Sequence, residues 1–315
     1  RHSSVRGGGR YKEQVKSGIL SMSAANNSAV SLPENESVAD LLNDIDGLVS
    51  PPDVCLRIFE LIHAPRTSSK EIAGVVSLDP SLTARLLRIA NSAYYSFSRK
   101  IDTVSRAVTI IGNSELYSLV LSVSAVKSFT CIPNELVSME TFWRHSVYTG
   151  LLARALARRV NVMHPERLFV AGLLHDIGSL VLYHERSEEM RDLLLLADGD
   201  EDLLYHAETD QLGFTHATLG GYLLGKWQTP EELQQAVLWH HEPARAESAV
   251  MEAHLVNLAS HLANGTAQGN FAGLAEPELQ LPAGILDAVH LGEDALSSAV
   301  QEADDQFPSM LGALL

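Results

Sequence analysis

The chain has 315 residues, of which 46% are hydrophobic, 6% aromatic and 20% charged. This apolar content excludes wholesale disorder, and the scarcity of aromatic residues favours helices over a β-sandwich. The formal net charge of -16 disfavours nucleic acid as a partner, because an acidic body repels a phosphate backbone. The length allows about two domains, or one large domain with extensions.

The N-terminal segment lacks the features of a folded or targeting element. Residues 1–21 are basic and rich in glycine, and they have no apolar signal-peptide core. We expect residues 1–30 to be an arm that is disordered or foreign to the native chain. No apolar run reaches the roughly 18 residues of a membrane span, so no membrane partner is expected. Two cysteines without a C-x-x-C pair fit a reducing compartment and a cytoplasmic protein.

A first group of helices is expected between Pro51 and Phe129, where apolar residues recur at helical spacing. The expected N-caps within this group are Asp79, which precedes a proline, then Thr103, and then Asn113 or Ser114. Five short helices of this kind predict one compact helical lobe over residues 31–135.

A second group of helices follows a break at residues 131–134. Ser138 is the expected N-cap of a long helix through about Val160, and Pro165 begins another that runs to His175. Further helices are expected over residues 185–197, 201–206, 216–226, 231–240 and 248–264. The second lobe is assigned to residues 136–265, and residues 266–315 to an acidic extension with a helix over 284–305. The absence of a useful strand pattern predicts an all-α fold.

Histidines are concentrated in the apolar helices of the second lobe. Six residues stand out in the segments FWRHSVYTG, GLLHDIGSL, FTHATLGGYLL and VLWHHEP: His145, His175, Asp176, His216, His240 and His241. An unpaired polar ring is costly in such surroundings, so each of these side chains needs a partner. Five imidazoles beside one carboxylate favour a shared metal, since these ligands suit Fe, Mn, Zn or Ni.

The adjacent His175 and Asp176 strengthen the metal hypothesis. An aspartate next to a histidine can bridge two ions, and paired ions activate water for phosphoester hydrolysis. Ala171 and Gly172 share a helical face with His175 and would let a neighbouring helix come close, as converging ligands require. The residues alone leave two interpretations open, metal ligands or core histidines that hydrogen-bond to one another.

The motif order H…HD…H…HH resembles the HD superfamily of phosphohydrolases. Two upstream segments, LDPSLTARLLRIANSAYY at residues 78–95 and SRAVTIIG at residues 105–112, are similar to its HDOD family, the HD-related output domains. The resemblance covers roughly residues 38–265. It implies an N-terminal helical lobe packed on an HD-phosphohydrolase-like helical lobe. It also implies a regulatory role in bacterial signal transduction.

The resemblance also implies metal-binding roles for the six residues. His145, His175 and Asp176 match the first three ligands of the HD pattern. The remaining three, His216, His240 and His241, match the additional ligands that the HD-GYP phosphodiesterases use for a second metal.

Three departures from the HD pattern make cyclic-dinucleotide hydrolysis unfavourable. The last HD ligand is an aspartate in a segment like LADxLA, but this chain has LASHLAN, with Ser260 in that place. The lysine that often follows HDIG in active phosphodiesterases is replaced by Ser179. The GYP segment is absent, and the chain continues HHEPARAESAV. We therefore assign no catalytic residue and expect an incomplete metal site.

Three functions fit these features to different degrees. The sequence favours a non-catalytic bacterial signalling module that binds a protein partner or a small ligand, with a divalent transition metal as the one cofactor considered. The alternative is a metal-dependent phosphohydrolase acting on a nucleotide or cyclic nucleotide, which the six ligand-type residues favour. A nucleic-acid-binding regulator is disfavoured by the acidic body.

Overall fold

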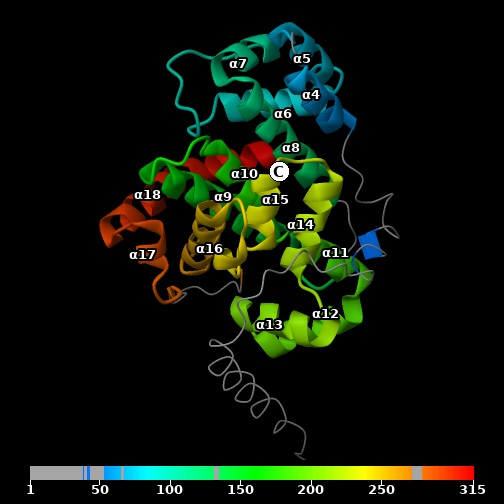
Figure 1. Ribbon diagram of the computed structural model, residues 1–315. Helices are drawn as coiled ribbons and strands as arrows, with labels where there is room; N and C mark the ends of the chain where they lie inside the picture. The colour runs from blue at the N-terminus through cyan, green and yellow to red at the C-terminus, as the bar shows by residue number, and fades with distance from the viewer. Residues whose placement is uncertain (1–37, 39–40, 43–52, 65–66, 131–134, 272–278) are drawn as a thin grey trace, which may run out of the picture.

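Every regular element in the described part of the chain is a helix (Figure 1). The computed structural model describes residue 38 and residues 41–42, 53–64, 67–130, 135–271 and 279–315. The expected arm over residues 1–30 lies outside the described residues, as does Cys131, whereas Cys55 is a buried free thiol. The prediction of an all-α fold is confirmed.

Two groups of helices form the body of the molecule, named here the first and the second lobe. The first lobe consists of α4 (Asp53–His63), α5 (Ser69–Val76), α6 (Pro80–Ala90), α7 (Val104–Ile111) and α8 (Asn113–Phe129). The second lobe consists of α9 (Met139–Arg159), α10 (Glu166–Leu174), α11 (Ile177–Glu185), α12 (Ser187–Ala197), α13 (Glu201–Leu212), α14 (His216–Lys226), α15 (Glu231–Leu238), the 3₁₀ turn η1 (Pro243–Arg245) and α16 (Val250–Asn264). Two helices follow, α17 (Ile285–Val289) and α18 (Glu293–Leu314). In Figure 1, α4, α5 and α7 lie at one end and α12 and α13 at the other.

Helix α8 joins the two lobes and is buried over most of its length. It packs against α4, α6 and α7 of the first lobe and against α10 of the second. Its side chains are apolar or small on nearly every face, which is the pattern of a helix surrounded by protein. Most buried apolar residues accordingly form one continuous core that extends from α4 through both lobes to α18, while Leu238, Trp239, Ala246 and Ala253 form a small separate cluster.

The predicted helix starts follow from side-chain caps. Asp79 accepts hydrogen bonds from two backbone amides at the start of α6, and Thr103 and Ser138 each accept one at the starts of α7 and α9. These caps satisfy amides that have no partner within the helix. The cap expected at Asn113 or Ser114 is wrong, because α8 already begins at Asn113 and Gly112 precedes it without a side-chain bond.

Three helices differ from the expected ranges. Helix α11 was not expected as a separate element, and its residues from Ile177 to Tyr183 are all buried. Helix α13 extends to Leu212, well beyond the expected range of 201–206. The helix expected over residues 284–305 is interrupted after α17 at His290, which has a left-handed backbone (φ 56°), and α18 then continues to Leu314.

Helices α9 and α10 cross at two glycines. A Cβ added to Gly172 would lie 2.7 Å from the Cα of Gly150, and one added to Gly150 would lie 2.6 Å from the Phe169 carbonyl oxygen. Real Cβ atoms do not approach other heavy atoms so closely, so the crossing requires glycine in both helices. The expectation that Gly172 lets a neighbouring helix come close is confirmed, and this contact brings His145 of α9 near the end of α10.

The segment that follows α6 connects the first lobe to α9. Asn91 exchanges two hydrogen bonds with the backbone of Ile101, at 2.7 and 2.8 Å, and so closes the intervening loop. Within that loop the buried ring of Tyr94 lies 3.7 Å, centroid to Cζ, from the guanidinium of Arg154 on α9. The same ring contacts Phe169 of α10 edge-on. The Tyr94 segment is therefore a contact between the lobes.

Helix α18 packs on α9, α6 and α8 and so touches both lobes. Its apolar face buries Phe307 and Met310, and its polar face binds α9 through Asp304, which accepts from the Tyr148 hydroxyl at 2.8 Å. The acidic extension thus adds to the core. No helix among the described residues combines the length and the apolar character that crossing a membrane requires.

Candidate metal centre

The six candidate residues lie together in the second lobe, on four different segments. His145 is in the second turn of α9, while His175 and Asp176 form the turn between α10 and α11. His216 is the first residue of α14, and His240 and His241 follow the end of α15. Five of the six are buried, and His241 is half-buried. The prediction that they converge is confirmed, while their role as metal ligands remains a prediction.

Four of the histidines hold their rings in the same way, by donating the Nδ1 hydrogen to a fixed acceptor. The acceptors are the Gly269 carbonyl for His145 (2.7 Å), the Gly172 carbonyl for His175 (2.8 Å), the Val237 carbonyl for His240 (2.7 Å) and the Glu208 carboxylate for His216 (2.6 Å). Carbonyl and carboxylate oxygens only accept, so the hydrogen resides on Nδ1. Each Nε2 therefore faces the site and offers a lone pair wherever the ring is neutral, which is the usual arrangement of metal-binding histidines.

Asp176 stands between two groups of imidazole nitrogens. Its Oδ2 lies 3.2 Å from Nε2 of His175 and 4.0 Å from Nε2 of His145. Its Oδ1 lies 3.3 Å from Nε2 of His216 and 3.7 Å from Nε2 of His240. One carboxylate oxygen thus faces each group, as expected of a residue that bridges two ions.

A second carboxylate, Glu201, reaches the site from the start of α13. Its Oε1 lies 4.0 Å from Nε2 of His175. The ligand atoms of Glu201, His145, His175 and Asp176 all lie within 4.8 Å of one another. The side chain of Glu201 accepts hydrogen bonds from Ser260 and Asn264 of α16. The sequence analysis did not identify Glu201 as a site residue.

Helix α13 contributes two further side chains that the sequence analysis missed. Glu208 is fully buried and accepts hydrogen bonds from both the backbone amide and the ring of His216. The ring of Tyr205 stacks on that of His241 with centroids 4.4 Å apart. Glu201, Tyr205 and Glu208 are spaced by four and three residues and so share one helical face. This spacing was the available signal, and extending the helix past residue 206 would have revealed it.

The surroundings of the histidines keep most of the rings neutral. Burial lowers the pKa of His240 to about 3 and that of His175 to about 4, and repulsion from neighbouring imidazoles adds to both shifts. Burial also lowers the pKa of His145. For His216 burial opposes the charged form too, but the carboxylates of Glu208 and Asp176 together outweigh it and raise the pKa well above its ordinary value. A cation at Nε2 of His216 would take the place of that proton.

Three buried polar atoms of the centre make no hydrogen bond among the described residues. They are Oδ1 of Asp176, Nε2 of His240 and Nδ1 of His241. Buried polar atoms without partners are costly, and a cation would satisfy Asp176 and His240 together. The residues present therefore fit a divalent ion bound by imidazole and carboxylate, such as Fe, Mn, Zn or Ni.

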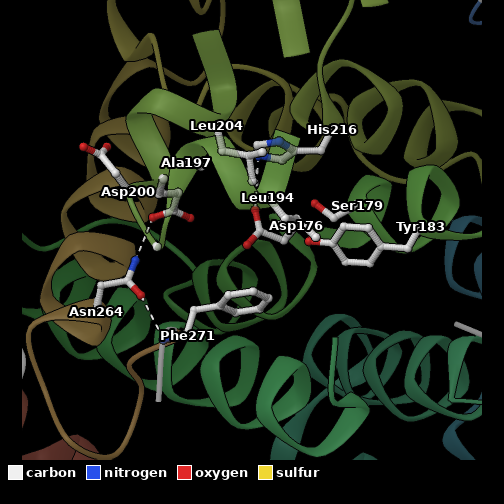
Figure 2. Close-up of a pocket in the computed structure, with 12 residues that line it drawn as sticks. Asp176, Ser179, Tyr183, Leu194, Ala197, Asp200, Leu204, His216, Asn264 and Phe271 are labelled. Carbon is white, nitrogen blue, oxygen red and sulfur yellow. Dashed lines mark hydrogen bonds and ion pairs between the residues drawn. The ribbon is translucent and has the colours of Figure 1, made fainter. Parts of the chain in front are cut away.

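A small cavity of about 60 Å³ adjoins this centre. Figure 2 shows Asp176 and His216 pointing toward each other at its wall, with Phe271 on one side and Ser179 and Tyr183 on another. Ser179, in the position where active phosphodiesterases often have lysine, is buried and lines the cavity. The cavity walls also include Asp200 and Glu201.

Comparison with known proteins places this centre in a family. The HDOD domain profile matches residues 48–243, and the chain belongs to the HDOD family. An uncharacterised protein of Treponema pallidum (strain Nichols) is 27% identical over 210 residues. That match spans 65% of this chain but 39% of the Treponema protein, so the chain covers only part of its relative's length.

Solved structures share the fold. An HDOD domain protein of unknown function from Geobacter sulfurreducens is 24% identical with a TM-score of 0.66, covering 89% of this chain and 97% of that one. A protein from Shewanella amazonensis, provisionally named a phosphohydrolase, is 22% identical with a TM-score of 0.68 over 88% and 98% of the two chains. A provisionally named signal transduction protein from Marinobacter aquaeolei is 20% identical with a TM-score of 0.67, over 90% of this chain and 67% of that one.

Proposed function

We propose that this chain is a bacterial signal-transduction module that holds divalent metal in an HD-type centre and acts by binding a protein partner or a small ligand, without efficient hydrolysis. The size of the cavity at the centre carries the proposal. Its volume of about 60 Å³ accommodates about four to six water molecules at about 10–15 Å³ each. Sites for ligands of drug or nucleotide size typically enclose about 300–1,000 Å³.

The charge around the cavity supports the same function. Its described walls include the carboxylates of Asp176, Asp200 and Glu201 and contain neither Lys nor Arg. A phosphoester develops negative charge in the transition state, and phosphoryl-transfer sites place cationic side chains there. The described walls of this cavity supply no Lys or Arg for that role, which favours a function other than efficient phosphoryl transfer.

The proposed ions would be held in two groups that share Asp176. His145 and His175 would hold one ion, and His216, His240 and His241 would hold the other. Such ions, when bound, act as Lewis acids and generate hydroxide from water. The protein contributes ring orientation through the Nδ1 hydrogen bonds and excludes bulk water by burial.

The alternative function is a metal-dependent phosphohydrolase. The bridging position of Asp176 between two groups of imidazoles favours it, because this is the geometry of two-metal hydrolysis. It requires the cavity to widen enough to admit a phosphoester.

Elemental analysis of the purified protein together with an assay on bis(p-nitrophenyl) phosphate separates the two functions. We expect bound transition metal and turnover no faster than that of an Asp176→Asn variant, which controls for contaminating phosphatase. Turnover with Mn²⁺ or Fe²⁺ that disappears in Asp176→Asn would favour the enzyme. Protein without metal after supplementation with these ions would overturn the proposed metal centre.

A further inference from the structure

Ser260 occupies the place of the missing aspartate, but a carboxylate is present within hydrogen-bond distance of it. The Ser260 hydroxyl lies 3.2 and 3.1 Å from the two carboxylate oxygens of Glu201. Asn264, one turn further along α16, donates to Oε2 of Glu201 at 2.7 Å. The face of α16 that would have carried the acid instead carries two donors that hold an acid from α13.

We infer that Glu201 is a metal ligand that replaces the missing aspartate, so that a bound ion ties α13 to the body of the second lobe. The inference rests on the proposed metal centre. Ligands at about 2.0–2.2 Å from one ion lie up to about 4.4 Å apart. The ligand atoms of Glu201, His145, His175 and Asp176 already lie within 4.8 Å of one another, so a slight contraction suffices.

The attachment of α13 gives this ligand a regulatory consequence. Helix α13 packs its backbone mainly against α12, and Figure 1 shows the pair at the end of the molecule away from the first lobe. Besides apolar contacts such as that of the buried Ala207, its links to the rest of the second lobe include side chains at the centre, Glu208 on His216 and Tyr205 on His241. Without an ion, Glu201 and Asp176 approach the same space as like charges. With an ion, both bind it, and the α12–α13 pair becomes fixed.

Metal titration and hydrogen exchange on the full chain test the inference. Protein stripped with a chelator is titrated with Mn²⁺ or Zn²⁺, and amide exchange is followed by mass spectrometry. We expect the wild type to bind two ions and exchange in α12 and α13 to slow at least about tenfold. In Glu201→Gln one ion should bind at least about tenfold more weakly, and the slowing in α12 and α13 should be lost. Asp210→Asn, an exposed carboxylate on the same helix, should behave as the wild type.

A double variant separates loss of a ligand from damage to the fold. Glu201→Gln combined with Ser260→Asp returns a carboxylate to the centre from α16 instead of α13. We expect tight binding of both ions to be restored, while exchange in α12 and α13 stays fast. Unchanged binding and unchanged protection in Glu201→Gln would overturn the inference and leave the proposed metal centre intact. A wild type that binds no ion would overturn both.

Discussion

The orientation of four of the five histidines depends on one partner outside the centre. Three of these partners are backbone carbonyls, which no side-chain substitution removes. The fourth is Glu208, a fully buried carboxylate that accepts a hydrogen bond from the ring of His216. A buried carboxylate is unfavourable unless it is paired and hydrogen-bonded. The position of Glu208 is therefore best explained by its effect on the orientation and basicity of His216.

Glu208 is therefore open to a direct test. Glu208→Gln keeps an acceptor for the His216 amide but removes the negative charge. We expect one ion to bind about 10–100-fold more weakly, as is typical when a partner behind a metal-binding histidine is lost. Calorimetric titration of metal-free protein with Zn²⁺ measures this, with Asp210→Asn as the matched control. Equal affinities in both variants would show that Glu208 does not act through the metal.

A second prediction at the scale of single residues concerns Gly178, which follows the histidine–aspartate doublet. A Cβ added there would overlap the His216 carbonyl and lie 2.7 Å from the Gly220 amide nitrogen, so α14 would have to move. We expect Gly178→Ala to lower the free energy of unfolding by about 2–3 kcal/mol. Gly74→Ala in α5 is the control, since open space surrounds it and alanine favours a helix by up to about 1 kcal/mol. Urea unfolding compares the two, and similar effects would contradict this account.

Helix α11 was harder to predict than the helices that bury only one face. The apolar stripe of α4 can be recognised in the sequence because its apolar residues recur with helical period. The starts of α6 and α9 can be recognised by their N-cap residues. Helix α11 has no such period, since its residues from Ile177 to Tyr183 all face protein. A local sequence pattern indicates a helix when one face contacts the core and the other contacts solvent. The buried residues of α11 have no solvent-facing side, so they show no such pattern.

The candidate metal ligands also differ in how readily the sequence identifies them. His145, His175 and His216 could be predicted because a histidine within an apolar segment is conspicuous. Glu201 lies in an acidic stretch that begins at Asp198, where solvent exposure is the ordinary interpretation of a carboxylate. Its contact with α16 spans 59 residues of sequence, which no local pattern encodes.

The N-cap of α6 supports a prediction about pH. Hydrogen bonds to the carboxylate from the backbone amide of Leu82 and from Ser81 lower the pKa of Asp79 to about 2. A depressed pKa means that the cap stabilises the fold above the ordinary value near 3.8 and loses this effect as the pH falls toward 2. We expect Asp79→Ala to cost about 1 kcal/mol at pH 7 and progressively less below pH 4. Urea unfolding at several pH values measures the difference, and the exposed Asp192→Ala should show little effect at any of them.

At the scale of the whole molecule, one continuous core predicts cooperative unfolding. Phe307 of α18 is buried against Tyr148 of α9, and the same helix packs on α6 of the first lobe. Phe307→Ala should destabilise the protein by about 3–5 kcal/mol, whereas Leu195→Ala, 74% exposed, should change little. Calorimetry should show a single transition in each protein. Two resolved transitions in the wild type would indicate lobes that unfold independently.

Helix α9 connects the contact with the Tyr94 segment of the first lobe to the candidate metal centre of the second. It carries His145 near its start and, nine residues later, Arg154, whose guanidinium packs on the Tyr94 ring of the first lobe. The two positions are about 14 Å apart along the axis, at 1.5 Å per residue. A packed helix of this length transmits a push with little bending. We therefore expect a partner that displaces the Tyr94 segment to move His145 of the proposed metal centre as well, and metal release measured with and without such a partner would detect the coupling.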